Sequence, residues 1–253
     1  MDVEKYTNSK LYDFFEWTFK LIIWNLLVVF IVGITFGVVF FPTYYFLKEG
    51  IFATILYIAS IVLGIFIFVP SYATIFSCIK IFKEDGYAET FALFFDRLWD
   101  NIKSLWKPTL FIMGICSIFL VAIYIDYVAL SNEEIIGATR IVCTVSYYVL
   151  LIVLLIIFLC FLNVPMAVAH FRMHTWALLL FTLRITFQKI FSTVIYLLLF
   201  VMPLLLLCTF VNVLFPIWLL IGFSVPLFIS YFVARKDYWK LVKNISEMNK
   251  EDF

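Results

Sequence analysis

The chain has 253 residues, of which 65% are hydrophobic and 14% are charged, and its mean hydropathy is +1.09. Soluble domains contain about 25% charged residues, so these values exclude an ordinary soluble fold. The net charge of +1 gives no electrostatic basis for a nucleic-acid partner. We expect an all-α, polytopic helical membrane protein with six transmembrane helices plus interfacial amphipathic helices.

The N-terminal part predicts an interfacial amphipathic helix at 8–20 and a first span at 21–41. Asn25 lies within this span, where an Asn either bonds another helix or lines a path for a solute. Gly33 and Gly37 form a GxxxG motif in the same span, which allows a second helix to approach closely. That helix belongs either to this chain or to a partner, so both glycines are candidate contact residues.

A second span is predicted at 51–70, within an uncharged run that continues to Ile79. Residues 87–106 then show the clearest amphipathic pattern, with apolar residues at helical spacing. We expect this helix to lie along the inner membrane surface, with these side chains buried: Phe91, Phe95, Leu98 and Ile102. It either anchors the next span or docks a cytoplasmic partner, and its candidate contact residues are Phe91, Phe95, Arg97, Asp100 and Lys103.

The third and fourth spans are predicted at 110–128 and 141–169, and a further interfacial helix is predicted at 171–190. Asn163 lies within the fourth span. As for Asn25, it bonds another helix or lines a solute path. Both asparagines are therefore candidate intramembrane polar residues.

The C-terminal part contains a long uncharged stretch, because residues 191–234 include no Asp, Glu, Lys, Arg or His. As one helix this stretch would be about 66 Å long, whereas the hydrocarbon core of a bilayer is about 30 Å thick. It therefore predicts a helical hairpin, with spans at 191–210 and 215–233. We expect the break at residues 212–216, where Asn212 favours a turn and Pro216 lacks a donor.

The distribution of Lys and Arg predicts the orientation. With the N-terminus inside, all but two of the 18 Lys and Arg residues fall in inside segments, and the exceptions are Lys48 and Arg140. Cytoplasmic loops carry an excess of these residues. Six spans with both termini in the cytoplasm therefore fit the sequence better than five.

We find no residue pattern for catalysis or metal binding. GxSxG, HExxH and Walker motifs are absent, and the five cysteines are scattered. His170 and His174 share one helix face but lack nearby Cys, Asp or Glu ligands. Only Asp126 comes close to lying deep in the bilayer, and we expect it at the outer end of the third span. The lack of an Asp, Glu or His at the centre of a predicted span weighs against a proton-coupled transporter. We expect no enzyme activity, no cofactor and no metal.

Two stretches carry a family resemblance. Residues 8–27 are an amphipathic lead that runs into Asn25-Leu26-Leu27. Residues 70–107 contain a Pro-led helix, a basic turn and a Phe-rich helix, with Pro70, Ala73, Lys80, Lys83, Asn101 and Lys103 at the matching positions. Both resemble the YesL-like family of bacterial integral membrane proteins, although typical members lack the intervening second span. The resemblance implies a multi-pass protein of the bacterial cytoplasmic membrane, associated with carbohydrate uptake and breakdown in Gram-positive bacteria.

Two functional hypotheses follow. The first is a non-enzymatic integral membrane accessory subunit of a carbohydrate ABC import system, with the lipid bilayer and ABC permease subunits as partners. The chain lacks the Glu-Ala-Ala loop of such permeases, so it is not expected to be the permease itself. The alternative is a small six-span solute-binding membrane component, or a transporter that acts without a permease partner. The sequence leaves the oligomeric state and any substrate open.

Overall fold

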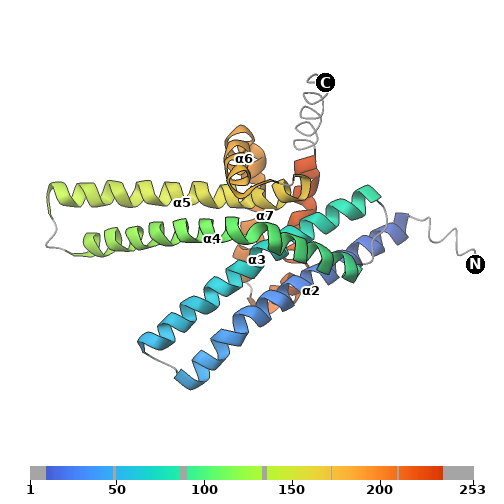
Figure 1. Cartoon of the computed structure of the whole chain (residues 1–253), viewed down its shortest axis with the longest axis horizontal. Coiled ribbons are helices and arrows are strands. Elements are labelled where there is room, and N and C mark those ends of the chain that lie inside the picture. The colour runs from blue at the N-terminus through green and yellow to red at the C-terminus, as the bar shows by residue number, and fades with distance from the viewer. Residues whose placement is uncertain are drawn as a thin grey trace, which may run out of the picture.

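The computed structural model describes residues 10–47, 50–85, 90–132, 136–171, 173–209 and 211–235. These residues form helices and short connections, and no strand occurs among them (Figure 1). The predicted all-α, polytopic fold class is confirmed.

Four helices are each long and apolar enough to cross a membrane: α2 (Lys10–Pro42), α3 (Ile51–Asp85), α4 (Thr90–Ser131) and α5 (Ala138–His170). A π-helical turn, η1 (Thr43–Leu47), follows α2. The remaining helices form two bent pairs. The first pair joins α6 (Thr175–Gln188) to α7 (Ile190–Thr209) at 100°, and the second joins α8 (Val211–Ile221) to Ser224–Arg235 at 47°. The described chain is thus a multi-pass membrane protein with four spans, or six if each bent pair is one span.

The long helices form two hairpins, α2 with α3 and α4 with α5, which cross at one end and diverge at the other (Figure 1). We call the shared end the crossing end. It contains the start of α2, the last third of α3, residues 90–107 of α4 and the end of α5. Basic residues gather here, namely Lys20, Lys80, Lys83, Arg97 and Lys103, whereas Arg140 lies at the start of α5, away from the crossing end.

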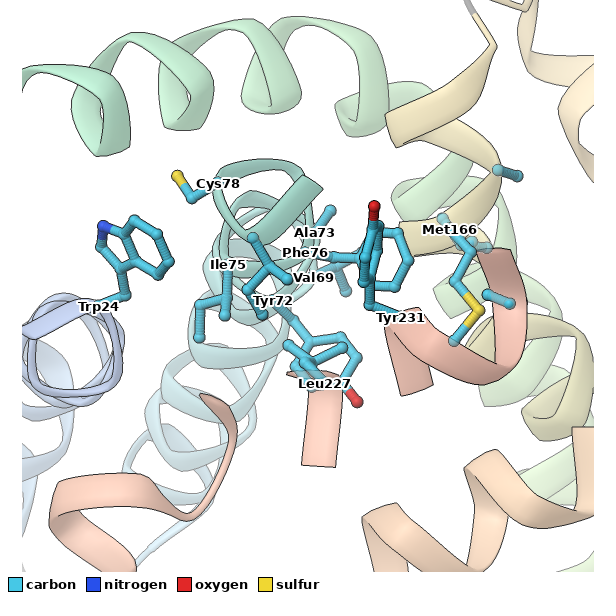
Figure 2. Packing of buried hydrophobic residues seen from close by; sticks show 14 of the residues in the cluster. Trp24, Val69, Tyr72, Ala73, Ile75, Phe76, Cys78, Met166, Leu227 and Tyr231 are labelled. Atoms are coloured by element: carbon cyan, nitrogen blue, oxygen red, sulfur yellow. The ribbon is translucent and has the colours of Figure 1, made fainter. Parts of the chain in front are cut away.

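The core of the protein is centred on α3, in which every residue from 69 to 79 is buried. Trp24 packs on one side of this segment, and Met166 and Tyr231 lie on the other (Figure 2). Helices of a membrane protein that are covered by protein on all faces can stay apolar beyond the length of the bilayer. This burial explains why the uncharged run of the second predicted span continues to Ile79.

The expected interfacial helices at 8–20 and 87–106 are not separate elements within the described residues. Helix α2 continues through Lys20, whose Nζ lies 2.7 Å from Glu16 Oε1 and 3.5 Å from the centre of the Phe82 ring. Lys20 is therefore neutralised inside the fold and need not mark a membrane surface. Helix α4 continues through Pro108, so its 42 residues span about 63 Å.

One face of α4 packs on the protein core. Phe94, Leu98, Asn101 and Leu105 are buried there and Ile102 is partly buried, whereas Phe91 and Phe95 lie on the outer surface of the protein. The predicted burial of Leu98 is confirmed, and burial of Phe91 and Phe95 at the inner membrane surface stays a prediction. The indole Nε1 of Trp24 donates to Thr90 O at 3.2 Å, which fixes the start of α4 against α2.

The predicted break of the C-terminal stretch lies inside a helix. Helix α7 ends at Thr209, and α8 begins at Val211 and passes through residues 212–216. The predicted break is wrong. A break that the sequence analysis did not predict occurs at Gly222–Phe223, between α8 and Ser224–Arg235.

Candidate functional site

A polar cavity of about 730 Å³ opens at the crossing end, between α3, the first half of α4, the end of α5 and the start of α6. Its polar lining consists of Ser77, Lys80 and Glu84 from α3, Arg97, Asp100, Asn101, Lys103 and Ser104 from α4, and His170 from α5. Cavities of about 300–1,000 Å³ hold small molecules in other proteins. This cavity is therefore large enough for a ligand.

Helical spacing places the α4 residues of the cavity together. Arg97, Asn101 and Ser104 are separated by three or four positions, so they share one face of the helix. The buried residues of α4 lie beside this face, and an exposed aromatic row lies on the far side of them. Helix α4 thus presents a polar cavity wall, a core face and an aromatic face around its circumference.

The cavity holds three cations and two carboxylates, and one long ion pair joins them within the described part of the chain. Arg97 Nη1 lies 4.0 Å from Asp100 Oδ2, and the two side chains are 41 and 58% exposed. The Lys103 Nζ lies 4.9 Å from the centre of the Trp99 ring. Among the described residues, no carboxylate approaches Lys80 or Lys103 within 4.0 Å. The cavity therefore contains positive charges that the carboxylates of the described residues do not contact closely, and these charges can bind an anion.

Lys80 is the best-fixed of these cations, because its Nζ donates a hydrogen bond to Ala169 O at 2.8 Å. The last carbonyl groups of a helix lack partners within the helix, so Lys80 satisfies one at the end of α5. His170, the last residue of α5, has its Nδ1 2.8 Å from Met166 O. These contacts join α3 to α5 and position the cavity wall.

A buried hydrogen bond ties the cavity wall of α4 to the core. Asn101 Nδ2 donates to Thr74 Oγ1 at 3.0 Å, and Thr74 Oγ1 donates to Pro70 O at 2.7 Å. Pro70 and Asn101 are two of the residues that carry the YesL-like resemblance. The structure links them through Thr74, whose role the sequence alone did not indicate.

Asn25 spans the break after α8. Its Nδ2 donates to Leu219 O at 2.7 Å, and its Oδ1 accepts from the backbone N–H groups of Phe223 and Ser224 at 2.7 and 3.0 Å. One fully buried amide therefore satisfies both ends of the break. Of the two alternatives for Asn25, the described contacts show the bond to another helix.

Asn163 has a comparable place at the bend between α6 and α7. Its Nδ2 lies 3.1 Å from Thr186 Oγ1 and 3.1 Å from Thr193 Oγ1, one on each helix of the pair. Its Oδ1 is buried without a partner among the described residues. The amide group thus connects α5 to both sides of the 100° bend.

The structure separates the candidate contact residues into three places. Arg97, Asp100 and Lys103 line the cavity together, whereas Phe91 and Phe95 are exposed on the aromatic face of α4. Gly33 lies apart from both, and no described atom comes within 4 Å of a Cβ built on it. A Cβ on Gly37 meets only Phe41 of its own helix, at 3.2 Å. Gly33 is therefore uncovered, whereas Gly37 is buried under Phe41 of its own helix, and no other described helix packs closely on either glycine.

The arrangement favours binding of a ligand in the cavity through charge and hydrogen bonds. The described residues contain no group of three or more His, Cys, Asp or Glu residues that could hold a metal ion. No family model, no curated protein and no solved structure matches this sequence. The residues and their geometry, together with the resemblance described above, are thus the basis for a functional proposal.

Proposed function

We propose that this chain is a non-enzymatic accessory subunit that docks on the permease of a carbohydrate ABC import system. The aromatic face of α4 carries this proposal: Phe91, Phe95, Trp99 and Trp106 are 56, 50, 60 and 44% exposed. Aromatic residues are enriched in protein–protein interfaces and dominate their binding energy. The carbohydrate system is inferred from the resemblance to the YesL-like family.

The length of α4 supports a docking role for its first half. About 20 residues suffice to cross the hydrocarbon core, and the 42-residue helix continues well beyond that length. The aromatic face lies on residues 90–107, at the crossing end where the basic residues gather (Figure 1). We place this end, and with it both termini, on the cytoplasmic side of the bacterial membrane, because cytoplasmic segments are rich in Lys and Arg.

Purification from the native host in a gentle detergent tests this proposal. We expect a permease chain to co-purify with the parent protein, and to be lost from the Phe91→Ala, Phe95→Ala double variant. Truncation of a central aromatic contact weakens binding by about 2 kcal/mol or more. Because both side chains are exposed, this variant should keep the melting temperature of the parent.

A matched control is available on α2, where Phe14 and Phe15 are also neighbouring exposed aromatics. The Phe14→Ala, Phe15→Ala double variant should retain the permease. A parent protein that purifies without any partner would contradict the proposal. So would a permease that stays bound when Phe91 and Phe95 are replaced.

The second candidate is a solute-binding membrane component that acts without a permease. The polar cavity of about 730 Å³ favours it, since its volume and charged lining suit a small polar molecule. Purified chain reconstituted alone into vesicles would then bind or transport a solute. The accessory subunit, in contrast, has no transport activity without its permease.

A further inference from the structure

We propose that the polar cavity at the crossing end binds a phosphate ester that carries hydroxyl groups. Lys80, Arg97 and Lys103 all line this cavity, and the described carboxylates leave their charges largely unpaired. The lining has more cations than carboxylates, so its net positive charge favours an anionic ligand. Lys and Arg are the side chains that proteins use most to bind phosphate.

Two of the cations that line the cavity have donors that the described contacts leave unused. Lys80 uses one of its three N–H donors on Ala169 O, so two remain, and that bond holds the ammonium group in place. Arg97 has five donors on a planar group, and its one ion pair is a 4.0 Å contact with Asp100. Lys80 therefore supplies a fixed cation from α3, and Arg97 supplies a planar group with several donors from α4.

The balance of charge narrows the class of ligand. Three cations against the two carboxylates Glu84 and Asp100 leave an excess of one positive charge in the cavity. A phosphate ester carries one negative charge as a diester and up to two as a monoester, so this excess favours binding of either form. The two carboxylates accept hydrogen bonds when ionised, so they can bind hydroxyl groups next to the phosphate. Glycerol phosphate and sugar phosphate groups have this combination.

Two sources present the same chemistry to the cavity. One is the headgroup of an anionic lipid such as phosphatidylglycerol, since basic pockets between membrane helices bind anionic headgroups. The other is a soluble phosphate ester. The lining also contains apolar residues, among them Val168, Phe171, Met173 and Leu178. These suit the start of an acyl chain, although the proposal requires only the phosphate ester.

The test measures binding of two probes to the detergent-purified chain: short-chain phosphatidylglycerol and glycerol 3-phosphate. The cavity variant is Arg97→Gln with Lys103→Gln, which leaves the structural contact of Lys80 intact. The control variant is Lys83→Gln with Lys107→Gln, which also removes two positive charges from the crossing end but from residues that do not line the cavity. The two variants therefore separate the cavity from the general charge of this end.

We expect the cavity variant to bind its probe about tenfold or more weakly, because charge-assisted hydrogen bonds are lost, and the control to bind like the parent. Loss of phosphatidylglycerol binding alone identifies a lipid headgroup as the source, and loss of glycerol 3-phosphate binding identifies a soluble ester. A parent protein that binds neither probe overturns the proposal, and so do equal losses in both variants. Permease co-purification depends on Phe91 and Phe95, so each proposal can fail without the other.

Discussion

At the scale of single residues, Asn25 shows how a membrane protein can break a helix. A break leaves carbonyl groups on one side and N–H groups on the other without helical partners, and lipid cannot supply them. The Asn side chain carries both a donor and an acceptor. Asn25 uses the donor on Leu219 O and the acceptor on the N–H groups of Phe223 and Ser224.

We predict that Asn25→Leu, which keeps the size of the side chain, lowers the free energy of unfolding by about 2–4 kcal/mol, since buried groups lose their partners. The matched control is Thr35→Val in the same helix, because Thr35 Oγ1 donates to the carbonyl of Ile31, one turn earlier, and to no other described residue. Thermal or SDS-induced unfolding in detergent measures both. If Asn25→Leu unfolds like the control, the amide group does not stabilise the break.

The sequence alone identifies Asn25 and Asn163 as polar residues in apolar segments, but it leaves their roles open. The partners of Asn25 lie almost 200 positions away in the chain, and local pattern carries no information about such distant contacts. Thr186 and Thr193 are closer to Asn163, yet they face it only because the chain bends by 100° between them. The residue type is thus predictable, whereas the contact depends on the tertiary fold.

At the scale of helices, spacing predicts that a helix exists better than it predicts where the helix ends or which face is buried. Phe91, Phe94 and Phe95 are all apolar, so the pattern of α4 allows more than one core face. The structure selects the face with Phe94, since Trp24 fixes the start of α4. Pro108 and Pro216 are common signals of a helix end, yet both lie inside helices here.

Gly222 marks the break that the sequence analysis missed, and it allows a sharp test. A Cβ on Gly222 would lie 2.5 Å from Trp218 O, a backbone atom that cannot move freely, whereas a Cβ on Gly33 meets no described atom within 4 Å. We predict that Gly222→Ala lowers the free energy of unfolding by about 1–3 kcal/mol. Gly33→Ala should instead raise it by about 0.5–1 kcal/mol, because Ala favours the helix.

Unfolding of the two purified variants, measured side by side, checks both signs. A neutral Gly222→Ala variant would show that the break tolerates a side chain. A strongly destabilising Gly33→Ala variant would show that a helix packs against the GxxxG motif after all. The same replacement, Gly to Ala, should lower the free energy of unfolding at position 222 and raise it at position 33. A general effect of replacing Gly would change both variants in the same direction.

At the scale of the whole molecule, composition is enough to predict a helical membrane protein, because 65% hydrophobic residues cannot be covered by 14% charged ones. Composition does not predict how the spans are arranged. The crossing of the two hairpins and the cavity beside it arise from contacts between α3, α4 and α5 (Figure 1). For this reason the sequence pattern favours a partner surface for Arg97, Asp100 and Lys103, whereas in the structure all three line one cavity.

The concentration of Lys and Arg at the crossing end leads to a prediction about orientation. Positive charges are retained on the cytoplasmic side during insertion, so the crossing end should be inside and the α4–α5 turn outside. Ile136 lies beside that turn and is 74% exposed, and Asp96 is exposed on the first half of α4. In a background with all five native cysteines replaced, an impermeant maleimide should label Ile136→Cys in intact cells. Asp96→Cys should react only after the membrane is opened, because the reagent cannot reach the cytoplasm.

Labelling of Asp96→Cys in intact cells would place the cavity on the outer face. The docking partner and the phosphate ester would then have to be sought outside the cell.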